Sequence, residues 1–92
     1  MVNKKINLKI YGRVQGVFFR SSAQSKAKKL NLVGYVKNKD DGSVEIVAEG
    51  KQENLKEFLK WCYNGPIMAK VEKIDKSWQK ANFEFEKFQI KY

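Results

Sequence analysis

The sequence predicts an α+β fold in which two helices cover one face of a mostly antiparallel sheet. Apolar and polar residues alternate near both ends of the chain, with the two-residue period of strands that bury one face. Two intervening segments carry apolar residues at helical spacing, and an Asp-Gly pair separates two short β-prone runs in the middle. At 92 residues the chain is long enough for one compact core. We therefore expect a single domain over residues 1–92.

The first strand and the first helix flank a stretch that contains two glycines. In residues 4–12, apolar positions alternate with polar residues or tyrosine, which predicts a strand with one buried face. Residues 12–19 contain both glycines. The segment from there to position 30 has neither glycine nor proline, which favours a helix. Its apolar residues fall at helical spacing: Phe19, Ala23, Ala27 and Leu30.

A hairpin and a second helix follow. Residues 33–37 and 43–49 predict the second and third strands, and Asp41-Gly42 between them is a strong turn signal. The next segment predicts the clearest helix, and Gly65-Pro66 after it is a typical stop signal. The apolar residues of that helix are spaced i, i+3, i+4 and i+7: Leu55, Phe58, Leu59 and Cys62.

Two further strands complete the chain. Residues 67–78 predict a fourth strand, whose alternation slips between Val71 and Ile74, so we expect a bulge or a ragged start. After a loop at residues 79–86, residues 88–92 predict a short closing strand. The order β-α-β-β-α-β with an added strand is that of a ferredoxin-like sandwich. Its helical crossover makes the first two strands parallel, so residues 12–20 and Asn38 should meet at one edge of the sheet.

The composition narrows the possible chemistry. A net charge of +9 suggests an anionic partner, which could be a nucleic acid, a membrane surface or a phosphorylated small molecule. All but two of the 19 basic residues are lysines, and the two arginines, Arg13 and Arg20, lie in one short segment. The chain has no histidine, so it lacks the usual general base near neutral pH. The single Cys62 cannot form an internal disulfide, has no histidine to join it in a zinc site, and is expected to fill the core.

Nothing in the sequence indicates a membrane segment. No apolar run approaches the ~20 residues that cross a bilayer. The start of the chain alternates in hydrophobicity and does not have the pattern of a signal peptide. We therefore expect a cytoplasmic protein.

The loop at residues 12–20 is the candidate binding site. It joins a strand to the start of a helix, where backbone N–H groups lack partners and point along the positive end of the helix dipole. Such a junction binds anions through its backbone, and Arg20 at the helix start could close over the anion. An ordinary strand-to-helix turn accounts for the same local pattern.

Residues 12–20, Gly-Arg-Val-Gln-Gly-Val-Phe-Phe-Arg, resemble a motif of the acylphosphatase family. That motif follows the first strand and reads Gly-Arg-Val-Gln-Gly-Val, then a variable residue, an aromatic residue and an arginine. Residues 34–38, Gly-Tyr-Val-Lys-Asn, with Asp41-Gly42 and Val44-Glu45 behind them, resemble the second motif of the family. Gly65-Pro66 and the closing strand match as well, so the resemblance covers nearly the whole chain.

The resemblance implies a metal-independent hydrolase without a cofactor, which cleaves the carboxyl-phosphate bond of small-molecule acyl phosphates. Arg20 and Asn38 would be the catalytic residues, with Asn38 orienting the attacking water. The phosphoryl group would be held by Arg20 and by loop amides, with inorganic phosphate inhibiting as the product. We expect a monomer without a nucleic-acid or membrane partner. The implied substrate-binding residues are Gln15, Gly16, Val17, Phe18, Phe19 and Arg20.

The absence of histidine is compatible with this chemistry. A carboxylate is a good leaving group, and phosphoryl transfer proceeds through a loose transition state. Positioning and charge stabilisation then suffice without a strong protein base. The proton of the water can pass to a phosphate oxygen of the substrate itself.

Other conspicuous residues have structural interpretations. We expect Tyr11 to pack on the surface and Arg13 to have a structural role. Phe18 and Phe19 should anchor the core and the loop rather than contact a ligand. Two residues should cover the boundary between helices and sheet: Trp61 and Trp78.

A further expectation concerns the end of the sequence. If the closing strand runs alongside the second strand and in the same direction, Tyr92 reaches the edge that holds Arg20. The carboxylate of Tyr92 would then steady the guanidinium.

Two alternatives share the predicted fold. An RNA-recognition domain has the same element order and suits a positive charge, but it needs stacking aromatics on its central strands. The third predicted strand has no aromatic residue and two acids, Glu45 and Glu49. A carbamoyl-phosphate-handling module, like the acylphosphatase-like domain of a hydrogenase-maturation carbamoyltransferase, is the second alternative. That module is part of a much longer chain.

Overall fold

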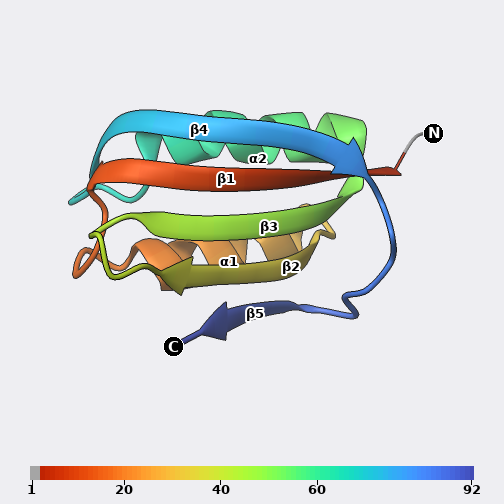
Figure 1. Cartoon of the computed structure of the whole chain (residues 1–92), viewed down its shortest axis with the longest axis horizontal. Coiled ribbons are helices and arrows are strands. Elements are labelled where there is room, and N and C mark those ends of the chain that lie inside the picture. The colour runs from red at the N-terminus through yellow and green to blue at the C-terminus, as the bar shows by residue number, and fades with distance from the viewer. Residues whose placement is uncertain (1–2) are drawn as a thin grey trace.

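The computed structural model describes residues 3–92, which form one five-stranded sheet with two helices on one of its faces (Figure 1). This confirms the expected ferredoxin-like α+β arrangement. The elements follow one another as β1 (Asn3–Arg13), α1 (Phe19–Lys29), β2 (Val33–Asn38), β3 (Val44–Lys51), α2 (Gln52–Asn64), β4 (Lys70–Lys80) and β5 (Phe88–Lys91).

The strand order in the sheet is β4-β1-β3-β2-β5. β3 pairs antiparallel with both β1 and β2, so β1 and β2 run in the same direction and stop at the same end of the sheet. β5 pairs with β2 in parallel, placing Lys91 opposite Lys37. The topology therefore brings the β1–α1 loop, the end of β2 and the end of β5 together at one end of the sheet. The candidate site described below lies at that end.

The core fills the space between the sheet and the helices. Alternating positions of β1 and β3 face the helices, while α1 and α2 turn their apolar stripes toward the sheet, as the sequence periodicity predicts. Cys62 is fully buried, in agreement with its expected role as a core residue. The main contributors are Ile6, Leu8, Ile10, Val44, Ile46, Ala48, Phe19, Ala23, Ala27, Leu55, Phe58 and Cys62.

β4 differs in detail from its prediction. It begins at Lys70 rather than at residue 67, and it runs to Lys80. The slip between Val71 and Ile74 is a genuine bulge, because Tyr11 pairs with Lys73 while Gly12 pairs with Val71, which leaves Glu72 as the extra residue. The strand lies at the edge of the sheet and is largely exposed, so its sequence carries little of the alternation that marks a buried face.

Phe18 is also not where it was expected. Its side chain is 73% exposed, whereas Phe19 is buried in the core. Phe18 immediately precedes α1 and adopts a left-handed backbone conformation, which turns its ring away from the core side. The expectation that Phe18 and Phe19 anchor the core and the loop holds for Phe19, whereas the exposed Phe18 lines a pocket at the start of α1.

Neither helix, at 11 and 13 residues, has the length and hydropathy of a membrane-spanning segment within the part of the chain that the structure describes.

Candidate active site

A pocket of about 250 Å³ opens where the β1–α1 loop, the end of β2 and the end of β5 meet. Its walls combine exposed backbone, one arginine, one asparagine and the side chains of the last strand. The lining residues are Val14, Gly16, Phe18, Phe19, Arg20, Ser21, Asn38, Ile90 and Tyr92.

The backbone of the loop that lines this pocket adopts an unusual conformation. Gly16 has a φ of 73° and Phe18 a φ of 65°, so two nearby residues take left-handed conformations. A Cβ at Gly16 would meet nothing within 4 Å, so the conformation, and not crowding, calls for glycine there. A left-handed phenylalanine costs on the order of 1–3 kcal/mol, and such strain concentrates at functional sites.

The first backbone N–H groups of α1 have no hydrogen-bond acceptor within the described residues. Its first backbone bond runs from the N–H of Ser22 to the carbonyl of Phe18, at 3.1 Å, so the N–H groups of residues 19–21 have no partner within the helix. No side chain caps this end, and the first turn holds no acidic residue. The N–H groups of residues 15–18 take no part in the backbone hydrogen bonds of the described loops. These donors, together with the helix dipole, favour a phosphate-sized anion.

Arg20 carries the positive charge of the pocket. The centre of its guanidinium lies 4.8 Å from the centroid of the Tyr92 ring, a cation–π contact. Among residues 3–92, Arg20 forms no ion pair with a carboxylate, so its charge is available to a ligand. The parallel β2–β5 pairing confirms that Tyr92 reaches Arg20, but the aromatic ring makes the contact instead of the expected carboxylate.

Asn38 ends β2 and faces the same pocket. Its side-chain oxygen Oδ1 is buried, and no group in residues 3–92 donates a hydrogen bond to it. A buried acceptor without a donor costs about 1–3 kcal/mol. A ligand or a water that donates a hydrogen bond at this position would remove that cost.

Gln15 connects the two halves of the site without lining the pocket. Its Nε2 donates to the carbonyl of Lys39 at 2.7 Å and to the carbonyl of Ser43 at 2.9 Å. Both acceptors belong to the turn that follows Asn38. The side chain of Gln15 therefore ties the loop that precedes Arg20 to the turn that carries Asn38.

The structure brings most of the predicted site residues together. Gly16, Phe18, Phe19, Arg20 and Asn38 all line the pocket, while Gln15 and the buried Val17 do not.

Sequence reasoning did not assign three of the lining residues to the site: Val14, Ser21 and Ile90. Ser21 follows Arg20 in the first turn of α1, and its hydroxyl donates to the carbonyl of Phe18 at 3.2 Å. Ile90 and the ring of Tyr92 complete the wall that β5 provides. The alternation of the closing strand was visible in the sequence, but nothing local showed which of its faces meets the loop.

A family model described as Acylphosphatase matches residues 6–90. The chain belongs to the acylphosphatase family. Members are hydrolases that act on the acyl phosphate bond, and this chain is an enzyme of that class.

Individual relatives agree along most of their length. An acylphosphatase from Roseiflexus sp. (strain RS-1) is 44% identical over 81 residues, covering 88% of this chain and 87% of the relative. The crystal structure of acylphosphatase from Bacillus subtilis superposes with a TM-score of 0.93 at 39% identity, covering 97% of this chain and 99% of that one.

A third comparison concerns a larger protein. Full-length HypF, in its phosphate- and nucleotide-bound form, matches with a TM-score of 0.89 at 26% identity. The match covers 98% of this chain but only 12% of HypF. The relatives that match along both chains are named acylphosphatases, so the acylphosphatase assignment is favoured over the carbamoyl-phosphate-handling alternative.

Proposed function

We propose that the pocket hydrolyses acyl phosphates by direct attack of a water molecule on the phosphorus atom. Arg20 and the backbone amides of residues 15–20 hold the phosphoryl group, and Asn38 orients the water. The carboxylate leaves, and inorganic phosphate remains as the second product. Residues 1–92 act as one domain in this proposal.

The observation that carries the proposal is the buried Oδ1 of Asn38, which lines the pocket without a hydrogen-bond donor. A fully ionised phosphoryl group has only acceptor oxygens and cannot supply that donor. A water molecule can, because it has two O–H donors and keeps a lone pair free for attack. The asparagine therefore suits the nucleophile, whereas the arginine and the amides suit the phosphoryl group.

Charge stabilisation comes from groups that are already in place. The strained loop and the uncapped helix start present donors before a ligand arrives, so little reorganisation accompanies the reaction. The proton of the attacking water passes to a phosphoryl oxygen of the substrate. Because the leaving carboxylate is stable, the reaction needs no histidine, metal or cofactor.

The test compares Arg20→Gln with Asn38→Ala. Arg20 contacts phosphate in the ground state and stabilises the transition state further, so Arg20→Gln should weaken phosphate binding and also lower turnover by at least ~100-fold. Asn38→Ala should leave phosphate affinity nearly intact and reduce kcat, because it removes an interaction made on the way to the transition state. Phosphate affinity and steady-state kinetics with benzoyl phosphate measure both effects, with folding checked by thermal denaturation.

Two outcomes contradict these roles. One is a folded Asn38→Ala enzyme with near-normal turnover, and the other is an Arg20→Gln enzyme that still binds phosphate normally. Loss of activity on adding a chelator would contradict the metal-free mechanism.

The proposal extends to the setting of the enzyme. Inorganic phosphate should compete with the substrate, since it occupies the same cradle. The monomeric state and the cytoplasmic location expected from the sequence belong to the proposal, with sedimentation and cell fractionation as their tests.

A further inference from the structure

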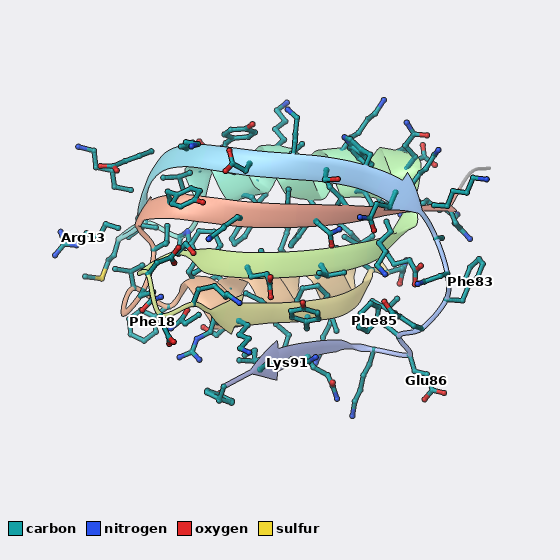
Figure 2. All side chains as sticks on the ribbon, in the orientation of Figure 1. Arg13, Phe18, Phe83, Phe85, Glu86 and Lys91 are labelled. Carbon is teal, nitrogen blue, oxygen red and sulfur yellow. The ribbon has the colours of Figure 1, made fainter. Side chains whose placement is uncertain are left out.

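A second pocket of about 250 Å³ lies at the opposite end of the sheet. Val33 lines it at the start of β2, while Asn38, at the end of that strand roughly 16 Å away, lines the first pocket. We call that first pocket the phosphate pocket, after its proposed ligand. Figure 2 shows Phe83 and Phe85 on the segment between β4 and β5, at the other end of the molecule from Phe18. We call residues 81–87 the crossover segment.

Glu49 is the buried acid of this pocket. It lies in β3, is 2% exposed, and lines the pocket. Its Oε2 accepts hydrogen bonds from the backbone N–H of Asn82 at 2.5 Å and of Phe83 at 2.9 Å. The other oxygen, Oε1, is buried, and no donor in residues 3–92 reaches it. One oxygen of this carboxylate thus binds the crossover segment, and the other has no hydrogen-bond partner among the described residues.

The lysine opposite Glu49 in the β1–β3 ladder forms its ion pair with another residue. Lys5 pairs with Glu49 across the β1–β3 ladder, but its Nζ lies 2.5 Å from Glu84 and 3.3 Å from Oδ1 of Asn82. Glu49 takes part in none of the ion pairs found among the described residues. Lys51, at the rim of the pocket, is exposed, so solvent screens its charge.

Two phenylalanines provide the apolar part of the pocket. Phe83 is 72% exposed and has a φ of 56°, a left-handed conformation that is costly for an aromatic residue. Its N–H bond to Glu49 holds it there. Phe85 packs edge-on against Tyr35, with ring centroids 5.9 Å apart. The faces of such rings attract cations as well as apolar groups.

We infer that this pocket binds a small organic cation, in which an ammonium or guanidinium group donates to Oε1 of Glu49 and an attached apolar group packs on Phe83. The ligand supplies both things that the carboxylate lacks, a donor and a compensating charge. Drug-sized pockets start at roughly 300 Å³, so this one suits a ligand of few heavy atoms.

The probe is benzylamine, titrated into the isotope-labelled full chain and followed by NMR. The expected result is saturable shifts of the backbone amide signals of residues 49–51 and 82–85. Benzyl alcohol is the matched neutral probe, because it has the same ring and a hydroxyl donor. It should bind at least roughly tenfold more weakly, since its neutral hydroxyl brings no positive charge to compensate the buried carboxylate.

Three variants locate the interaction. Glu49→Gln should weaken benzylamine binding by roughly tenfold or more. Glu45→Gln removes the same charge from the same strand outside the pocket, and should leave the affinity unchanged. Phe83→Ala keeps the backbone N–H that bonds Glu49 but removes the aromatic wall, and should weaken binding by roughly two- to fivefold.

Several results would overturn the inference. They are the absence of saturable shifts, equal affinity for benzyl alcohol, and shifts confined to the phosphate pocket. Unchanged affinity in folded Glu49→Gln has the same force. If Glu49→Gln fails to fold, Phe83→Ala decides, and full affinity in that variant rejects the site.

Discussion

Gln15 joins the two segments that supply Arg20 and Asn38. Its amide nitrogen bonds two carbonyls of the β2–β3 turn, those of Lys39 and Ser43. In the proposed mechanism, the phosphoryl group sits on one segment and the water on the other. Displacement of reacting groups by about 1 Å can cost on the order of 100-fold in rate, so the connection between the segments matters for turnover. Gln15 is a positioning residue in this account.

Replacing Gln15 by Ala should lower kcat more than it raises KM. The variant keeps Arg20 and the loop amides, so the phosphoryl group still binds, but the distance to Asn38 is no longer fixed. The carbonyls of Lys39 and Ser43 keep their backbone donors, the N–H groups of Gly42 and Lys39. Loss of the two side-chain hydrogen bonds should therefore lower the free energy of unfolding by only about 0.5–1.5 kcal/mol for each bond. Steady-state kinetics and urea denaturation measure the two effects separately.

Tyr35→Phe is the matched control for Gln15→Ala. It removes the hydrogen bond from the Tyr35 hydroxyl to Glu45, at 3.0 Å, away from the pocket. It should reduce stability without changing the ratio of kcat to KM. If Gln15→Ala behaves in the same way, the role of Gln15 is structural only.

At the scale of elements, α1 begins without the devices that normally stabilise a helix start. It has no capping side chain and no acidic residue in its first turn, and the residue before it is strained. A capping side chain contributes about 1 kcal/mol on average, which this helix forgoes. The free N–H groups are the reason that an anion can bind there, so an empty pocket has a stability cost.

Inorganic phosphate should therefore raise the thermal midpoint of unfolding. At ten times its Kd, a ligand that binds only the folded state contributes about 1.4 kcal/mol. For a domain of this size, that corresponds to roughly 6–10 °C. Differential scanning calorimetry over a phosphate series measures it, with chloride at equal ionic strength as the control.

The same titration on Arg20→Gln checks the origin of the effect. The shift of the midpoint should be much smaller, because the variant loses the charged contact to phosphate. An equal shift in both proteins would mean that phosphate acts on the lysine-rich surface in general.

The elements differ in how far the sequence reveals them. β1 alternates cleanly because one of its faces is buried, and α2 shows a full apolar stripe for the same reason. β4 is an exposed edge strand, so burial does not impose an alternation of apolar and polar residues on it. The predicted start of this strand therefore lies three residues too early.

The residues of the two pockets also differ in how far the sequence predicts them. Arg20 and Asn38 could be placed together because the crossover topology fixes where β1 and β2 end. The exposed Phe18 and the unpaired oxygen of Glu49 depend on backbone conformation and on contacts between distant segments. Neither leaves a local signal in the sequence.

At the scale of the whole molecule, the core between sheet and helices is closed to solvent. Cys62 lies within it at 0% exposure, and burial raises the pKa of its thiol. The thiolate is the reactive form, so both access and ionisation protect this residue while the protein is folded. Its reactivity should report on unfolding of the molecule.

A thiol reagent should label Cys62 at least roughly a thousandfold more slowly in native buffer than in denaturant. The rate should rise with urea in parallel with loss of structure. Ser77→Cys provides the control, because position 77 is exposed on β4 and its thiol should react at once. Labelling of Cys62 at the rate of the exposed thiol would show that the core opens locally.

The strand order also determines how this enzyme must assemble. Lys4 near the start of the chain pairs with Lys80, and Gly34 pairs with Phe88. Both pairings close long loops, and chains dominated by such distant contacts fold slowly, over milliseconds to seconds. The wall that Ile90 and Tyr92 give to the phosphate pocket comes from β5 and the residue after it, which are synthesised after the other four strands. A nascent chain that lacks β5 has an open pocket, so catalytic competence should appear only when this late strand docks beside β2.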